Sequence, residues 1–419
     1  MKPKILVISN DCFSKSSSNG RTMANFFSQW PKDKIAQFYI HDYNLSKETC
    51  ENYYHITDQD VLKSMFFIKP RKVNNKTSSS NSNSSSGVNR NALTMLLRNF
   101  AWNLGIWKKY GFSKWVLSYN PDIVLLQAGD SPFMYNLAVS ICKKTQAKLV
   151  IYNSEGYYFK NYDYFKSKGI AHLIYPIFLH VLKNSLEKAY AISCHNIYSC
   201  GQLKEAYDEK FKQNASVIYT SSSMKMIFKD NFTCKKPIIS YCGNLGVNRH
   251  KSLIEIGTII HDFDNDMCLD VYGRLPNSII KDELENCKGI NYKGLVSYDE
   301  VQSIMYNSDI NIHVESFEKF YIEDLKYGFS TKIADSLSCG TCFLVYAPKD
   351  IACVTYLQNN NAAHVVTNKN DLKSILYRII NDVEYRQKYL LNASKVAKQN
   401  HDQDRNIQKF QSILLKVYK

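Results

Sequence analysis

Short apolar runs alternate with longer amphipathic stretches along most of this chain. The runs are rich in β-branched residues and too short for helices, so they predict buried strands. They cover residues 5–9, 36–40, 123–127, 148–152, 191–193, 217–219, 238–242, 269–272, 290–293, 310–314, 342–346 and 363–366. Between them, apolar residues recur at helical spacing, as in Met23, Phe26, Phe27 and Trp30. Strands that alternate with helices predict an α/β fold with parallel sheets.

Two of the amphipathic stretches are strongly apolar. Residues 93–117 predict a helix in which leucine, phenylalanine and tryptophan alternate with Arg98 and several lysines. A basic, aromatic helix can lie on an anionic membrane surface, and a core helix with a solvated lysine face is the other interpretation. Residues 170–189 predict a second apolar helix, whose polar interruptions are more typical of a protein core than of a membrane segment.

The length and one low-complexity segment predict the domain organisation. A chain of 419 residues is too long for one ordinary core and predicts two domains. Residues 74–91 are rich in Ser and Asn and of low complexity, and we expect them to form a flexible surface loop inside the first domain. The polar Lys235-Lys236-Pro237 precedes a fresh strand, so we place the first domain at 1–235 and begin the second at 236.

The composition narrows the functional classes. The formal charge of +15 favours acidic partners, such as nucleotide-linked substrates, nucleic acid or an anionic membrane face. The twelve cysteines are scattered without the repeated ligand spacing of a zinc site, which argues against such a site and favours reduced thiols. We find no signal-peptide pattern and no apolar run near the length of a membrane span, so we expect a cytoplasmic protein.

Two predicted strands lead into loops that carry glycine and basic residues. The loop 10–21 ends in Asn19, Gly20 and Arg21. The loop after strand 238–242 contains Gly243, Asn244, Arg249 and Lys251. In open α/β sheets, ligands bind beyond the carboxyl ends of the strands, where such loops lie. For each loop, a plain connection between strand and helix is the alternative interpretation.

A third such junction, within residues 309–348, has the clearest chemistry. The strand 310–314 is followed by a polar loop at 315–326 and then by Gly328, Ser330, Thr331 and Lys332, which begin a helix. Free N–H groups, hydroxyls and a lysine together suit a phosphate or diphosphate. An ordinary capped helix between two strands is the alternative.

This third junction resembles the donor-site segment of the GT-B glycosyltransferases of family 4. The turn reads Tyr327-Gly328-Phe329-Ser330, and the helix carries Asp335 and then Ser338-Cys339-Gly340. The family has glutamates where this chain has Tyr327 and Asp335. Some of its branches read Gly-Phe-Ser-Thr-Lys, as this chain does. Glu318 and Glu323 are candidate substitutes for the missing carboxylate.

The resemblance implies a fold and an activity. It implies two Rossmann-like α/β domains that face each other across a cleft, the second at 236–395, with a C-terminal helix at 396–419 that crosses back to the first. It further implies a retaining, metal-independent glycosyltransferase that transfers a sugar from a nucleoside-diphosphate sugar to a glycan or lipid-linked acceptor. Synthesis of a bacterial capsule, exopolysaccharide or lipopolysaccharide fits this activity, with peripheral contact to an anionic membrane.

The resemblance also implies roles for individual residues. Arg249 and Lys332 would stabilise the leaving diphosphate, and Glu155, just past strand 148–152, would contact an acceptor hydroxyl. The other residues expected at the donor are Gly243, Asn244, Lys251, Gly294, Val296, Gly328, Phe329, Ser330, Thr331 and Asp335. Those expected at the acceptor or the cleft are Asn19, Gly20 and Arg21. No metal or other cofactor is expected.

Three other functions remain open on the sequence. A non-catalytic GT-B subunit that partners an active transferase is favoured by Tyr327 at the position of a glutamate. A nucleotide-sugar epimerase on the same fold would need cleft carboxylates and histidines that the sequence does not reveal. A nucleic-acid binder would explain the charge, but no nucleic-acid motif occurs and the basic residues are dispersed, so no nucleic-acid partner is expected.

Overall fold

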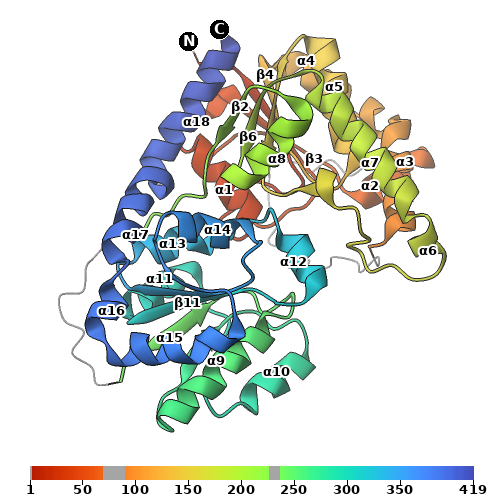
Figure 1. Cartoon of the computed structure of the whole chain (residues 1–419). Helices are drawn as coiled ribbons and strands as arrows, with labels where there is room; N and C mark the ends of the chain where they lie inside the picture. The colour runs from red at the N-terminus through yellow and green to blue at the C-terminus, as the bar shows by residue number, and fades with distance from the viewer. Residues whose placement is uncertain (1, 69–89, 226–235) are drawn as a thin grey trace. The chain divides into compact units, whose positions relative to one another are not determined.

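The computed structural model describes residues 2–68, 90–225 and 236–419 (Figure 1). The chain forms two compact units. The first comprises 1–218 and 407–419, and the second comprises 219–406. The first unit thus ends before the predicted boundary, whose residue 235 lies outside the described residues. The same holds for residues 74–89 of the predicted Ser/Asn-rich loop.

The first unit is built on a seven-stranded, wholly parallel sheet. Its strand order is β3-β2-β1-β4-β5-β6-β7. The strands are β1 (Ile5–Ile8), β2 (Ile35–Tyr39), β3 (Asn52–His55), β4 (Ile123–Gln127), β5 (Lys148–Asn153), β6 (Ser193–Tyr198) and β7 (Ala215–Val217). The helices are α1 (Ser18–Phe27), α2 (Asp58–Met65), α3 (Ala92–Leu104), α4 (Phe112–Tyr119), α5 (Pro132–Thr145), α6 (Ile170–Leu173), α7 (Tyr175–Tyr190) and α8 (Gly201–Phe211).

The C-terminal helix α18 (Gln403–Tyr418) completes the core of the first unit. Phe410 is fully buried and stacks on Phe26 of α1 at 4.7 Å between ring centroids. It also meets Phe27 edge-on at 5.1 Å. The helix begins inside the second unit and enters the first at Ile407. The returning helix therefore supplies part of the apolar layer that covers β1, β4 and β5.

Three features of the first unit differ from the sequence-based expectations. The predicted helix at 93–117 is broken into α3 and α4, because Gly105 and Gly111 adopt positive φ angles of 69° and 107°. The loop predicted at 10–21 ends at Ser17, whose hydroxyl caps α1. Strand β3 and helix α2 were not predicted, since β3 is only partly buried and lacks a distinct apolar run.

The second unit contains a six-stranded parallel sheet with the order β10-β9-β8-β11-β12-β13. Its strands are β8 (Ile239–Cys242), β9 (Leu269–Tyr272), β10 (Ile290–Gly294), β11 (Ile310–Val314), β12 (Cys342–Tyr346) and β13 (His364–Val366). Its helices are α9 (Arg249–Phe263), α10 (Ser278–Glu285), α11 (Tyr298–Asn307), α12 (Lys319–Leu325), α13 (Lys332–Ser338), α14 (Ala352–Asn359), α15 (Lys369–Asn381), α16 (Val383–Gln387) and α17 (Leu390–Val396). This sheet has the strand order of a doubly wound fold, and the predicted α/β class is confirmed.

Candidate functional site

Three glycines lie in a row at the carboxyl edge of the second sheet. Gly243 follows β8, Gly273 follows β9, and Gly294 ends β10. The amide of Gly243 donates to Tyr272, and that of Gly273 donates to Gly294 at 2.8 Å. A side chain on Gly273 would collide with the carbonyl oxygen of Gly243. This edge of the sheet is therefore close-packed backbone, which a ligand can approach without side-chain obstruction.

The loop after β8 places Arg249 at the start of α9. The side-chain oxygen of Asn244 accepts a hydrogen bond from the amide of Gly246 at 2.8 Å. Asn248 then adopts a left-handed conformation with φ 57°, and the helix begins at Arg249. Asn244 thus shapes the loop with its side chain, while the guanidinium of Arg249 is directed toward the end of β11.

Arg249 is held by Glu315, a residue that the sequence analysis did not select. Its Nε and Nη2 atoms donate to the two carboxylate oxygens of Glu315 at 2.7 and 3.0 Å. His313 contacts the same carboxylate at 3.3 Å. Burial raises the pKa of Glu315, but the charges and hydrogen bonds of Arg249 and His313 together outweigh burial and bring the pKa down to about 2. The carboxylate therefore stays ionised and fixes the guanidinium in one orientation.

Lys332, the first residue of α13, belongs to the same charged cluster. Burial and then the positive charge of Arg249 lower its pKa, while the charge of Glu315 opposes that shift. No hydrogen-bond or ion-pair partner of the Lys332 ammonium lies among the residues that the structure describes. A desolvated cation beside a second cation favours an anionic ligand. The negative charge of such a ligand would replace the stabilisation that the ammonium loses when it is withdrawn from water.

The turn before α13 is built around a buried phenylalanine. The amide of Gly328 donates to the carbonyl of Leu325 at 2.8 Å, which closes the turn. The ring of Phe329 packs against the rings of Tyr219, Tyr356 and His401. The Phe329 side chain is thus part of the core, and only its backbone remains for contact with a ligand.

Ser330 and Thr331 connect this turn to α13. The carbonyl of Ser330 accepts from the amide of Ile333 at 3.2 Å. Thr331 has helical backbone angles, and its side chain makes no capping hydrogen bond. The predicted Ser-Thr-Lys helix start is confirmed as local structure, with Lys332 as the first helical residue.

Asp335 is buried and hydrogen-bonded within the second unit. Its carboxylate accepts from the hydroxyl of Ser222 at 2.7 Å and from that of Tyr298 at 3.1 Å. It also acts on the pKa of Lys332 through its charge. Two carboxylates and two cations thus share this region, which makes the cluster formally neutral before any ligand binds.

Lys251 and Glu318 form a separate, exposed pair. The ammonium of Lys251 lies 2.6 Å from Glu318, which also accepts from Asn248 at 2.8 Å. Glu318 precedes α12, an element that the sequence analysis took for loop, and Glu323 is exposed on that helix. Glu315 is therefore the carboxylate that pairs with Arg249, one of the two cations predicted to bind the diphosphate. Neither Glu318 nor Glu323 contacts Arg249 in the described hydrogen bonds and ion pairs.

The loop after β10, where Gly294 and Val296 are expected at the donor, begins at a backbone with a positive φ. Gly294 has φ 88°, and its carbonyl accepts from Gly273. Val296 is half-buried, between the exposed Leu295 and the Ser297 cap of α11. These residues continue the glycine edge, so the second unit brings together most of the residues predicted at the donor.

In the first unit, Glu155 lies just past the carboxyl end of β5. Its carboxylate is 3.4 Å from the ammonium of Lys160, which sits 4.9 Å from the ring centroid of Tyr157 and 5.2 Å from that of Tyr164. The aromatic rings of this segment thus pack around the chain's own lysine. Glu155 remains about half exposed.

The three residues predicted at the acceptor or cleft lie in the first turn of α1. Asn19 is exposed, Gly20 is buried, and Arg21 is half-buried. The amide of Gly20 donates to the capping hydroxyl of Ser17 at 3.0 Å. Their place in a helix, rather than in the predicted loop, leaves Asn19 and Arg21 as the side chains that can reach a ligand.

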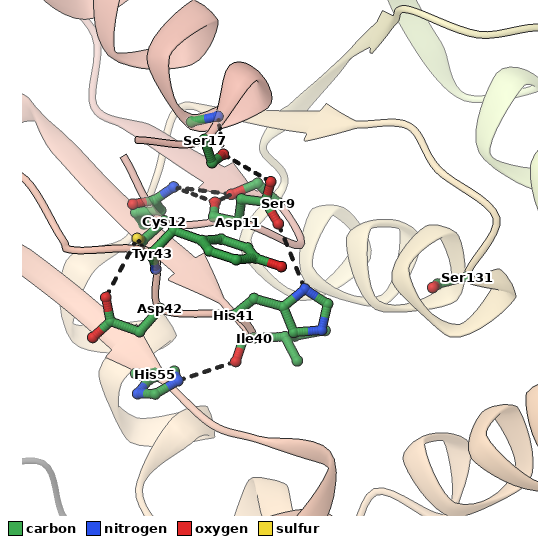
Figure 2. A network of polar contacts seen from close by, with 12 residues as sticks. Ser9, Asp11, Cys12, Ser17, Ile40, His41, Asp42, Tyr43, His55 and Ser131 are labelled. Carbon is green, nitrogen blue, oxygen red and sulfur yellow. Dashed lines mark hydrogen bonds and ion pairs between the residues drawn. The ribbon is translucent and has the colours of Figure 1, made fainter. Parts of the chain in front are cut away.

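A polar network beside α1 contains a histidine–aspartate pair that the sequence analysis missed. Figure 2 shows the ring of His41 turned toward Asp11, with Nδ1 3.5 Å from the carboxylate. The other oxygen of Asp11 accepts from the hydroxyl of Ser17 at 2.9 Å (Figure 2). Beneath the pair, the buried Gln37 donates to Ser9 and to the backbone of Asp11. The signal that could have found the pair is one polar residue shortly after each of two neighbouring strands, β1 and β2.

Among the residues that the structure describes, no group of three or more His, Cys, Asp or Glu side chains is arranged to hold a metal ion. None of the described helices has the length and apolar character needed to cross a membrane.

The fold is similar to that of several solved structures. HepE of Anabaena in complex with UDP matches with a TM-score of 0.66 at 11% identity over 99% of this chain and 100% of that chain. Sucrose-phosphate synthase from Thermosynechococcus elongatus matches with a TM-score of 0.60 at 11% identity, over 99% and 98%. A glycosyltransferase from Rickettsia africae matches with a TM-score of 0.56 at 15% identity, over 100% and 99%.

No related protein was found by comparison of sequences alone. No model of a known protein family matches the sequence, and no curated protein matches it. The structural neighbours are GT-B glycosyltransferases, and their likeness extends over the whole length of this chain. With its two parallel α/β units and its returning C-terminal helix, this chain has the GT-B fold.

Proposed function

We propose that this chain is a retaining glycosyltransferase that moves a sugar from a nucleoside-diphosphate sugar to a glycan or lipid-linked acceptor. The observation that carries the proposal is the desolvated ammonium of Lys332, which shares a charged cluster with Arg249 at the end of β11. A diphosphate would give this ammonium a direct ionic partner, which it has in none of the described hydrogen bonds and ion pairs. The fold supports the proposal, since HepE has been crystallised with UDP and with UDP-glucose.

The chemistry follows from the charge that develops during transfer. Breaking the bond between the sugar and the diphosphate leaves positive charge on the sugar and negative charge on the phosphate. Glu315 occupies two N–H groups of Arg249, and the remaining N–H groups can donate to phosphate oxygens. Because Glu315 fixes the guanidinium beforehand, little reorganisation is needed when the charge develops. The departing phosphate can itself take the acceptor proton, so no protein base or metal is required.

We assign the acceptor to the first unit. Glu155, Asn19 and Arg21 present polar side chains near the carboxyl edge of its sheet, and the Asp11–His41 pair adds a hydrogen-bonding group. A lipid-linked glycan of bacterial surface polysaccharide synthesis fits the net charge of +15, as does peripheral contact with an anionic membrane.

The test is sugar transfer by the purified chain and by Lys332→Ala. We expect turnover with one nucleotide sugar of a panel that starts with UDP-glucose, and a loss of about 100-fold or more in Lys332→Ala. Lys326→Ala removes an exposed lysine of the same segment and should keep wild-type turnover. The anomeric configuration of the product, read by NMR, tests retention. Unchanged turnover in Lys332→Ala with a normal thermal midpoint would refute the assignment.

A second candidate is a non-catalytic GT-B subunit. Tyr327 stands where the resembling family has a glutamate, and the two cations are already balanced by Glu315 and Asp335. This candidate predicts that the chain binds a nucleoside diphosphate but neither transfers nor hydrolyses the sugar of any donor. Calorimetric binding without turnover across the panel would favour it over the transferase.

A further inference from the structure

Helix α3 carries apolar side chains on two opposite faces. Ala92, Met95 and Trp102 are buried against the first unit. A second stripe, at helical spacing on the other side, is exposed to 42%, 59%, 60% and 45%, and consists of Leu93, Leu97, Phe100 and Leu104. A helix of an ordinary soluble domain has polar residues on its outer face, so this second stripe requires another explanation.

Two helices that pack against α3 also carry exposed apolar side chains. α3 packs against both α6 and α7, which lie beside it in the first unit (Figure 1). Their outer side chains include Ile170 and Leu173, which are 73% and 75% exposed, and Ile177, which is 57% exposed. We call these seven side chains of α3, α6 and α7 the apolar face. Exposed apolar side chains that gather on packed helices are typical of surfaces that bind a protein or a membrane.

The two stretches of sequence that contain the apolar face carry charges of one sign. Residues 90–121 and 164–186, which contain all of its members, include no Asp or Glu. Arg90 and Arg98 are paired with acidic residues of other segments. Asp163 contacts His172 of α6 at 3.1 Å. Lys166 and Lys168, which shortly precede α6, are exposed, as are Lys109 and Lys114 further along the chain from α3.

We infer that the apolar face inserts into the interfacial region of an anionic lipid bilayer. Leucine, isoleucine and phenylalanine surrounded by lysine are the pattern of helices that lie in the membrane surface, with the lysines at the level of the anionic headgroups. A protein partner is less favoured, because lysine is depleted at protein–protein interfaces. The apolar face would be the surface through which the proposed transferase contacts the membrane. The biological role of this contact rests on the proposed function.

The test is co-sedimentation of the full chain with vesicles, without any sugar donor. Wild type should bind vesicles of phosphatidylglycerol and phosphatidylethanolamine, and should bind phosphatidylcholine vesicles much more weakly. The double variant Leu97→Gln/Phe100→Gln should lower the partition coefficient at least about tenfold. A second variant on a different helix, Ile170→Gln/Leu173→Gln, should have a similar effect.

The control is Ile279→Gln, which replaces a 65% exposed isoleucine on α10 of the second unit and should bind vesicles as wild type does. Wild-type binding by both double variants would overturn the inference, as would the absence of wild-type binding to anionic vesicles. A wild-type dimer in sedimentation velocity that Leu97→Gln/Phe100→Gln dissociates would instead assign the apolar face to a second copy of the chain. Because no donor is present, any of these results leaves the transfer proposal standing.

Discussion

At the scale of single residues, the contact between Arg249 and Glu315 organises the candidate donor site. Both N–H donors of the guanidinium that face the carboxylate are used, and both groups are largely withdrawn from solvent. Such a pair is rigid, because the movement of either partner would leave the other as a buried charge without a counter-charge. Its value for function lies in orientation, since the remaining N–H groups of Arg249 are aimed before a ligand arrives.

Glu315→Gln tests this arrangement. The substitution keeps the shape of the side chain but leaves the charges of Arg249 and Lys332 without their main buried counter-charge. We expect the free energy of unfolding, measured by urea denaturation, to fall by about 3 kcal/mol. Inorganic pyrophosphate should raise the thermal midpoint of the variant by more than that of wild type.

The matched control is Glu318→Gln, which breaks the exposed pair with Lys251. An exposed pair contributes about 0–1 kcal/mol, so this variant should unfold almost as wild type does. Equal effects of the two substitutions would show that burial of the Arg249–Glu315 pair has no energetic consequence.

At the scale of elements, each unit repeats one arrangement, which is a parallel strand, then a polar or glycine-bearing loop, then a helix. In the second unit this strand–loop–helix arrangement places Arg249 at the start of α9 and Lys332 at the start of α13. In the first unit it positions Asp11 and the first turn of α1. Helix α18 is the exception to the order of the units along the chain. It lies far from α1 in sequence, but its side chains belong to the same hydrophobic core.

The contribution of α18 can be measured with Phe410→Ala. Phe410 is fully buried between Phe26 and Phe27, so its removal should leave a cavity and lower the free energy of unfolding by about 3–5 kcal/mol. Chemical denaturation followed by circular dichroism gives the value. Tyr418→Ala, at the 40% exposed end of the same helix, should change it by no more than about 0.5 kcal/mol.

At the scale of the whole molecule, acid sensitivity should come mainly from the second unit. Burial lowers the pKa of His364 and of His401 to about 4, from an ordinary value of 6.5. Burial holds the ring of His401 neutral, although its hydrogen bond to the carbonyl of Thr220 at 2.7 Å opposes that shift of the pKa, and its Nε2 atom lies 3.0 Å from the hydroxyl of Tyr356. Between these pH values the unfolded chain binds protons that the folded chain does not.

Stability should therefore be fully present above pH 6.5 and should fall as the pH drops toward 4, by at most about 3 kcal/mol for each buried histidine. Urea midpoints measured across this range give the slope. His401→Gln should make the slope shallower, whereas His180→Gln, at an exposed histidine of α7, should leave it unchanged. An identical slope in wild type and His401→Gln would show that the buried ring does not control acid stability.

Much of the fold could be predicted from local pattern. Strands such as 269–272, 310–314 and 342–346 were predicted at the bounds that the structure has, because short segments dominated by apolar residues are typical of the buried strands of a parallel sheet. Strand β3 was missed because its NYYH sequence is only partly buried and has no such run. The helix predicted at 93–117 was too long, since the pattern of apolar residues continues across two glycines whose positive φ angles end helices.

The candidate site was predictable in part. Arg249 and Lys332 were selected from their places after strands, and the structure puts them in one cluster, although their catalytic roles remain predictions. Glu315 was assigned to a polar loop, because nothing in its neighbourhood reveals that its partner is 66 positions away. The Asp11–His41 pair was missed for the same reason, since its members follow two different strands.

The sequence by itself determined the alternation of strands and helices, the glycine-bearing turns and the surplus of positive charge, because each depends on near neighbours in the chain. The tertiary structure alone decided which charges are paired, which aromatic rings are core, and which apolar side chains stay exposed. Those outcomes depend on burial and on contacts between distant segments. Glu315 shows the difference, since the same carboxylate would be an ordinary solvated charge if the fold did not bring Arg249 and His313 to it.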